Sequence, residues 1–175
     1  LIEEEKCIVL PNAINNNLFR KLDKKECRRK LSIPLDLFVI VSVGSFIERK
    51  GTTRIAKAID SLGECIYSIF VGKGPMEPTC KNILFKGTLT HEDIPIYLNA
   101  ADVFVLPTLN EGCCNAVVEA MACGLPIISS DRKFNWDVLN DSNSILIDPE
   151  NIDEIAVAIK RLYYDKELRS RLSDG

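Results

Sequence analysis

Long apolar runs are missing from this chain. No stretch approaches the roughly 20 residues that a transmembrane helix needs, and no signal peptide opens the chain. An excess of positive charge is missing too, because 22 lysines and arginines stand against 25 aspartates and glutamates, for a formal net charge of −3. General nucleic-acid binding usually requires a basic face. We therefore expect no nucleic-acid partner, and any phosphate site must be a local feature.

Metal-ligand patterns are scarce as well. The only histidine is His91, and the seven cysteines, odd in number and scattered, include no Cys-x-x-Cys pair. A zinc site therefore has little support, and we predict no metal. We expect most of the cysteines to act as small, reduced apolar residues in a cytoplasmic protein.

What is present is an ordinary globular composition, 46% hydrophobic and 27% charged over 175 residues. That length predicts a single domain, residues 1–175, with a well-buried core. The chain starts at Leu1 with an acidic run that leads straight into an apolar segment, and a helical pattern from Leu168 breaks off at Gly175. We therefore expect a domain taken from a longer protein.

Short apolar segments alternate with segments of helical spacing along the chain. Leu37–Val43 is continuously apolar, which is typical of a strand buried on both faces of a parallel sheet. Apolar residues recur at helical spacing in Thr52–Leu62. The predicted strands are 7–10, 37–43, 67–71, 83–85, 103–106, 127–128 and 145–147, and the predicted helices are 23–30, 52–62, 94–100, 115–123, 136–139 and 152–164. This order predicts an α/β fold with a Rossmann-like parallel sheet, whose ligands bind beyond the carboxyl ends of the strands.

Two glutamates mark a predicted loop-to-helix junction at that edge. Glu111 lies in the loop, and Glu119 lies inside the helix Asn115–Cys123, with seven residues between the two glutamates. Gly124 is expected to cap the end of this helix. Backbone N–H groups around residues 114–117 lack partners within a first helical turn and attract anions. The arrangement suits a ligand that carries both phosphate and vicinal hydroxyls.

These residues resemble a known family. The runs Ala101–Thr108, Glu111-Gly112 and Glu119–Pro126 are similar to the nucleotide-sugar-binding domain of retaining GT-B glycosyltransferases of the large fourth family, group 1. Further matches are Pro11–Asn15, Val43-Gly44, Arg49–Gly51, Phe70–Pro75 and Phe85–Gly87. The resemblance covers nearly the whole chain and implies the C-terminal half of a GT-B fold.

The resemblance implies a role for each motif residue. Lys50 would meet the donor diphosphate and offset charge as the phosphate leaves, replacing the metal of other transferases. Glu111 would face the transferred sugar near its reacting carbon, which makes Lys50 and Glu111 the catalytic candidates. Glu119 would accept hydrogen bonds from the ribose hydroxyls. The remaining donor-binding candidates are Gly44, Arg49, Lys86, Gly87, Cys114, Asn115 and Ala116.

The resemblance also implies what the rest of the protein does. The acceptor site would belong to an N-terminal domain absent from this chain, and the acceptor would be a glycan or glycolipid. Sugar transfer with retained configuration would need no metal and no cofactor besides the nucleotide-sugar donor. We expect a cytoplasmic protein of polysaccharide or glycolipid biosynthesis, with a peripheral position at the inner membrane face. The nucleotide base, donor sugar and oligomeric state are not encoded in these motifs.

The chain departs from the family pattern at several positions. Ser45 stands where the family usually has arginine; Arg49 either replaces that arginine or points into solvent. Cys114 stands at a frequent glycine position, and Asp137 stands where a glutamate is usual. These departures concern donor-sugar preference more than fold.

Other functions stay open at this point. A non-catalytic nucleotide-sugar-binding module would carry the same motifs, and a domain without any ligand is the simplest alternative. A Rossmann oxidoreductase is disfavoured, because Gly72-x-Gly74 is followed by Pro75 and lacks a third glycine. We interpret that segment as a sharp turn that lets a ligand approach, and Thr90–Asp93 as an N-cap that gives His91 a structural role.

Overall fold

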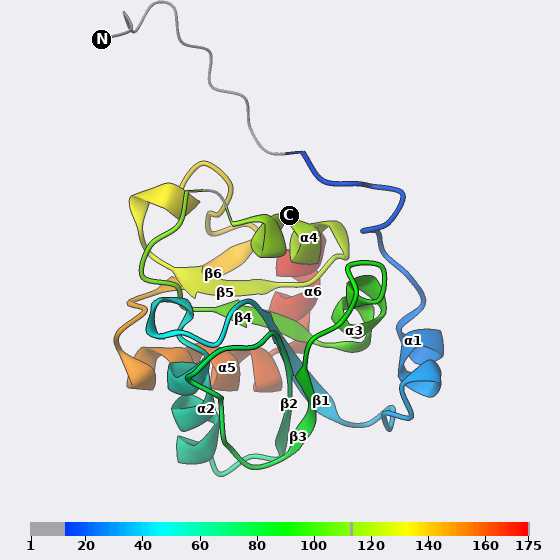
Figure 1. Ribbon diagram of the computed structural model, residues 1–175, viewed down its shortest axis with the longest axis horizontal. Helices are drawn as coiled ribbons and strands as arrows, with labels where there is room; N and C mark the ends of the chain where they lie inside the picture. The colour runs from blue at the N-terminus through cyan, green and yellow to red at the C-terminus, as the bar shows by residue number, and fades with distance from the viewer. Residues whose placement is uncertain (1–12, 113, 175) are drawn as a thin grey trace, which may run out of the picture.

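The computed structural model describes residues 13–112 and 114–174. These residues form one sheet of six parallel strands in the order β3-β2-β1-β4-β5-β6, with helices on both faces (Figure 1). The strands are β1 Phe38–Val43, β2 Ile66–Val71, β3 Ile83–Gly87, β4 Val103–Leu106, β5 Ile127–Ser130 and β6 Ser144–Ile147. The helices are α1 Lys24–Lys30, α2 Thr52–Ser61, α3 Ile94–Ala100, α4 Asn115–Ala122, α5 Ile152–Tyr164 and α6 Lys166–Asp174, with 3-10 turns η2 Glu48–Lys50 and η3 Lys133–Asn135. The predicted α/β class and Rossmann-like sheet are confirmed.

Successive residues of the central strands pack alternately into two separate cores, one on each face of the sheet. Val39 and Val41 of β1 join the core shared with α1, α3 and α4, while Phe38 and Ile40 join the core shared with α2, α5 and α6. Side chains of a strand alternate between the two faces of a sheet, so a strand covered on both sides must be apolar throughout. This is why β1 carries an apolar run, interrupted only by the buried Ser42.

The strand order reverses between β1 and β4. From β1 the chain proceeds outward through β2 to β3, and it then returns to place β4 on the other side of β1. In open parallel sheets the loops on either side of such a reversal diverge, and ligands bind in the crevice between them, beyond the carboxyl ends of the strands. The residues of those two loops are therefore the first place to look for a site.

The end of α4 follows from its sequence. The N–H of Leu125 donates to the carbonyl oxygen of Ala120 at 3.1 Å, and the N–H of Gly124 donates to that of Met121 at 2.8 Å. These two bonds form a Schellman motif, which requires a left-handed residue after the helix. Gly124 supplies it with φ 73°, so the predicted glycine cap is confirmed, one residue beyond the C-cap Cys123.

Some local predictions were wrong or lie outside the described residues. The helix expected over 136–139 is instead a 3-10 turn at Lys133–Asn135, and Trp136 follows it with a half-exposed side chain. Thr90 does not cap α3, whose N-cap is Asp93 without a side-chain bond to the helix. The strand predicted at 7–10 falls outside the described residues. No helix within 13–112 and 114–174 combines the length and apolarity needed to cross a membrane.

Cys27, Cys65, Cys80 and Cys123 are free thiols. Cys27, Cys114 and Cys123 are buried, whereas Cys65 is exposed. Burial raises the pKa of the Cys123 thiol to about 12, even though Asn99 and a backbone group hydrogen-bond to it. That thiol is neutral and inert at physiological pH, as expected for a small apolar residue.

Candidate active site

Lys50 and Glu111 meet where the strand order reverses. Lys50 ends the 3-10 turn after β1, and Glu111 follows β4. The Lys50 Nζ atom lies 2.5 Å from Glu111 Oε1. The lysine stem runs over Gly44, where an added Cβ would lie 3.5 Å from Lys50 Cδ. The structure therefore joins two residues that are 61 positions apart in the sequence.

Glu111 also receives a second cation and a hydroxyl. Arg49 Nη1 lies 3.1 Å from the same Oε1 atom, and Thr108 Oγ1 donates to it at 2.8 Å. Partial burial would raise the pKa of Glu111, but hydrogen bonds from Lys50 and Thr108 and the charges of Lys50 and Arg49 outweigh burial and lower it. Two cations thus share one ionised carboxylate, so among the described residues one positive charge has no matching negative charge.

Arg49 lies along the β4 loop. Its Nη1 donates to the carbonyl oxygen of Asn110 at 2.6 Å, and its own carbonyl oxygen accepts from the N–H of Leu109 at 2.8 Å. The sequence left open whether Arg49 points into solvent. Its side chain instead turns toward Glu111 and remains 45% exposed, which leaves part of the guanidinium accessible. Ser45, at the usual arginine position, is itself exposed.

The buried Arg54 fixes the positions of three loops. It donates to carbonyl oxygens of the β1 loop (Glu48, 3.0 Å), the β4 loop (Pro107, 3.0 Å) and the segment after β6 (Pro149, 2.8 Å). Gly51 makes room for this arrangement, because a Cβ there would lie 2.6 Å from Pro107 O. Sequence reasoning missed Arg54, since a basic residue inside an amphipathic helix normally faces solvent.

The glycines after β2 allow two loops to pack backbone against backbone. A Cβ on Gly72 would lie 2.0 Å from Gly44 O, and one on Gly74 would lie 2.3 Å from Phe46 O. The Phe46 N–H donates to the carbonyl oxygen of Lys73 at 2.8 Å. We expected Gly72-x-Gly74 to admit a ligand. The structure gives these glycines a different contact, with the loop that carries Lys50.

Glu119 has a partner that the sequence did not indicate. It is 9% exposed, and its Oε1 atom lies 3.1 Å from Nε2 of His91. The imidazole also packs on the buried Phe19 ring, with ring centroids 5.0 Å apart. His91 was expected to be only structural. It lies 28 positions from Glu119, in the segment between β3 and α3, and its contact fixes one oxygen of that carboxylate.

The remaining predicted residues occupy the same edge without forming one contact group. Lys86 in β3 pairs with Glu77 at 2.7 Å, and Gly87 accepts at its carbonyl oxygen from the N–H of Gly72 at 2.7 Å. Cys114, Asn115 and Ala116 open α4. We expected the first-turn N–H of Val117 to be available to an anion. This prediction was wrong, because that N–H donates to the carbonyl oxygen of Cys114 at 3.0 Å.

The carboxyl edge therefore carries a cation pair on a carboxylate, a helix start and a second, oriented carboxylate. Cations and helix N-termini bind phosphate, and a carboxylate accepts hydrogen bonds from hydroxyls. This edge matches the carboxyl-edge ligand site of open parallel sheets.

Residues 23–175 match the family model described as "Glycosyl transferases group 1". The chain belongs to this family. TuaC of Bacillus subtilis, a glycosyltransferase named for teichuronic acid biosynthesis, is 32% identical over 170 residues, covering 95% of this chain and 44% of TuaC. LpsD of Rhizobium meliloti, a lipopolysaccharide core biosynthesis glycosyltransferase, is 31% identical over 159 residues, covering 85% of this chain and 46% of LpsD.

Solved glycosyltransferases share the fold. WaaG, a glycosyltransferase involved in lipopolysaccharide biosynthesis, superposes with a TM-score of 0.85 at 20% identity, covering 98% of this chain and 51% of WaaG. The group 1 chain thus spans about half the length of these relatives. The resemblance to the C-terminal half of the GT-B fold is confirmed.

Proposed function

We propose that this group 1 glycosyltransferase chain is the donor-binding domain of a retaining enzyme. The enzyme would move a sugar from a nucleoside-diphosphate sugar to an acceptor hydroxyl. The observation that carries the proposal is the contact of Lys50 and Arg49 with one carboxylate, Glu111, where the strand order reverses between β1 and β4.

In this proposal the unmatched positive charge receives the donor diphosphate. A Lys50 ammonium released from Glu111 would donate to a phosphate oxygen, and Arg49 would add a second donor. As the sugar–phosphate bond breaks, negative charge builds on the leaving phosphate, and a fixed cation stabilises it. A side-chain cation would thus take the place of a metal. Glu111, ionised because of its lowered pKa, would face the positive charge that develops on the sugar carbon.

Glu119 would bind the ribose in the same complex. Its carboxylate accepts hydrogen bonds from hydroxyls, and the His91 contact holds one oxygen in place. The first turn of α4, at Cys114, Asn115 and Ala116, would meet the diphosphate, and the backbone at Lys86 and Gly87 would border the base. The solved structure of Anabaena HepE with UDP and glucose, 21% identical with a TM-score of 0.80 over 93% of this chain and 48% of HepE, supports a uridine nucleotide as the first ligand to test.

The rest of the enzyme is also proposed. An N-terminal domain would supply the acceptor site, and the acceptor would be a growing cell-surface glycan or a glycolipid, as the names of TuaC and LpsD suggest. We place the enzyme in the cytoplasm, peripherally at the inner membrane face. A non-catalytic nucleotide-sugar-binding module is the second candidate, favoured by Ser45 at the usual arginine position and by Asp137, which is exposed.

The test is a titration of the chain with UDP, GDP, ADP and their common sugar conjugates, followed by backbone amide NMR. Specific shifts at Lys50, Asn115 and Glu119 with one base would support the donor site and name the nucleotide. A folded sample that responds to no nucleotide, followed by a full-length protein that also binds none, would contradict the proposal. Binding by the full-length protein without sugar transfer would favour the non-catalytic module.

A further inference from the structure

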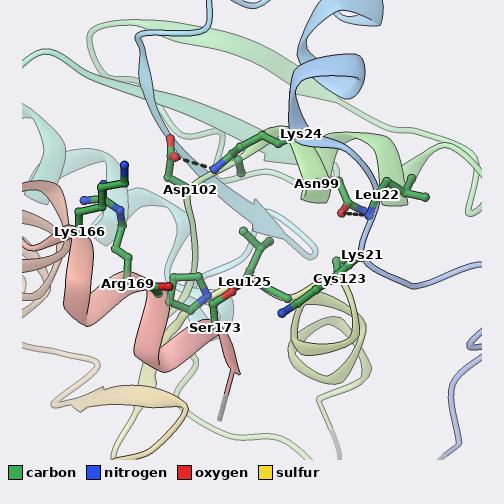
Figure 2. A pocket seen from close by; sticks show the side chains of 14 residues that line it. Lys21, Leu22, Lys24, Asn99, Asp102, Cys123, Leu125, Lys166, Arg169 and Ser173 are labelled. Atoms are coloured by element: carbon green, nitrogen blue, oxygen red, sulfur yellow. Dashed lines mark hydrogen bonds and ion pairs between the residues drawn. The ribbon is translucent and has the colours of Figure 1, made fainter.

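A second charged region lies at the amino edge of the sheet, away from the Lys50–Glu111 crevice. A pocket of about 360 Å³ opens between α6, the segment before α1 and the starts of β4 and β5. Figure 2 shows Lys166 and Arg169 on α6, and Lys24 beside Asp102. Lys21 also lines the pocket. This volume is at the lower end of the range for small-ligand sites, about 300–1,000 Å³.

Positive charge dominates the lining. Four cationic side chains and one acidic side chain, Asp102, line the pocket. Asp102 is already engaged: it contacts Lys24 at 2.6 Å and the buried Arg28 at 2.8 Å, and it accepts the N–H of Val39 at 2.7 Å. One carboxylate thus serves two cations. In a chain of net charge −3, this pocket is a local positive surplus.

Two cations on α6 have no carboxylate partner within residues 13–112 and 114–174. Arg169 donates to the carbonyl oxygens of Leu162 and Tyr163 and lies over the Phe38 ring, 5.3 Å from its centroid. Lys166 is exposed and makes no ion pair in that part of the chain. Burial lowers the pKa of Lys24; Asp102 opposes this shift, and the charges of Arg28 and Arg169 add to it.

The side of α6 that lines the pocket carries side chains with hydrogen-bond donors. Lys166, Arg169, Ser170 and Ser173 line the pocket at spacings of three and four residues, which places them on one side of a helix. Leu168 and Leu172 occupy the other side, inside the core shared with α2 and α5. The helix is thus held by its apolar side. On the pocket side, Arg169 Nη1 is engaged by the carbonyl oxygens of Leu162 and Tyr163, and Ser173 Oγ donates to the carbonyl oxygen of Gly124, so the Lys166 ammonium, the Ser170 hydroxyl and the remaining N–H groups of Arg169 are the donors left for a ligand. Such groups are the usual partners of phosphate oxygens.

We propose that this pocket binds a phosphate group carried by a small molecule or by a lipid headgroup. The phosphate lies against Lys166, Arg169 and Ser170, with Lys24 across the pocket, and the remaining volume accepts a glycerol-sized or sugar-sized substituent. The site is distinct from the donor crevice, because it lies at the opposite end of the strands. It does not depend on the proposed transferase function.

The experiment uses the 175-residue chain at about 0.15 M salt, where surface charges are largely screened. Inorganic phosphate and glycerol 3-phosphate are titrated while backbone amide shifts are recorded. In parallel, the chain is sedimented with vesicles of phosphatidylcholine alone or with phosphatidic acid. We expect shifts at residues 21–24 and 166–173, which are separate from any shifts that phosphate causes at Lys50 and Asn115 in the proposed donor site. A response to the soluble probes alone identifies a free phosphoester, and added retention by phosphatidic acid identifies a lipid headgroup.

Two variants of exposed residues test the assignment. Lys166→Gln should weaken phosphate binding roughly tenfold, the value of one charged hydrogen bond, and Ser170→Asp should abolish it by placing negative charge in the pocket. Lys57→Gln, which removes an exposed lysine of α2, is the matched control and should bind as the parent does. Circular dichroism confirms that each variant is folded. The proposal is overturned if neither phosphate nor phosphatidic acid binds, or if Lys166→Gln and Ser170→Asp bind like the control.

Discussion

Charged side chains are paired differently at the two edges of the sheet. At the carboxyl edge each carboxylate of the site has a named partner: Glu111 holds Lys50 and Arg49, and Glu119 contacts His91. At the amino edge Asp102 is engaged by Lys24 and the buried Arg28, and Asp174 by Lys21. Lys166 and Arg169 of α6 have no carboxylate partner among the residues that the structure describes. An anion at the carboxyl edge must compete with an internal carboxylate, whereas one at the amino edge can reach the exposed Lys166, which has no carboxylate partner in the part of the chain that the structure describes. The first arrangement suits a reacting ligand that is exchanged, and the second suits one that is simply held.

The largest expected effect is on sugar transfer by the full-length protein. Lys50→Ala removes the cation proposed to stabilise the leaving diphosphate, so the transfer rate should fall at least about 100-fold. The measurement is sugar transfer from a labelled donor to the acceptor. Lys57→Ala, an exposed lysine of the neighbouring helix, is the control and should leave the rate unchanged. Unchanged transfer by Lys50→Ala would remove this lysine from the mechanism.

The next effect is on stability at the amino edge. Asp102→Asn leaves Arg28, which is 3% exposed, without its buried counter-charge. Breaking a buried pair from one side costs about 3 kcal/mol of unfolding free energy. Urea unfolding of the parent and the variant gives the difference. A loss below about 1 kcal/mol would mean that the carbonyl oxygens around Arg28 are sufficient to hold it.

A smaller effect is expected on donor affinity at the carboxyl edge. Glu119→Gln removes the charge proposed to accept the ribose hydroxyls, so nucleotide affinity should fall roughly tenfold. His91→Gln keeps a donor near Glu119 and should cost only about threefold. Calorimetric titration of the nucleotide that gives NMR shifts measures both. If the His91 variant binds more weakly than the Glu119 variant, then His91 itself touches the nucleotide.

The smallest effect is the pH dependence that Glu111 contributes to stability. Its pKa is lowered in the folded protein, below the unfolded value of about 4.3. The stability it provides is therefore fully present above that unfolded value and is lost as the pH falls through the folded pKa. Glu111→Gln should reduce unfolding free energy at pH 7 on the order of 1 kcal/mol, kept small by solvent screening. In urea unfolding the difference should shrink toward pH 3, and a constant difference would contradict the assignment.

The sequence predicted most of the strands and helices because the local residue patterns agreed with one another. The run Ala101–Pro126 contains a strand, a loop and a capped helix, and each has its own pattern. The helix prediction for 136–139 was wrong because the spacing of Trp136 and Leu139, three residues apart, fits one turn of a helix as well as it fits a loop. In the structure Leu139 is buried, whereas Trp136 donates through Nε1 to Asp131 at 2.8 Å.

The candidate sites were predictable to different degrees. Lys50, Glu111 and Glu119 came from motif positions, and the structure places Lys50 and Glu111 in contact. The His91–Glu119 contact could not be predicted, because no periodicity links residues in separate loops. The amino-edge pocket was invisible for the same reason, since Lys21 and Asp174, which contact each other beside it, lie 153 positions apart.

Arg54 has a consequence for exchanging specificity between family members. Its guanidinium donates to carbonyl oxygens at Glu48, Pro107 and Pro149. A carbonyl oxygen is present whatever side chain its residue carries. The three loops can therefore accept foreign side chains while Arg54 keeps their spacing. Replacing the exposed loop residues with those of a relative should transplant sugar preference onto an unchanged frame, provided that Arg54 stays.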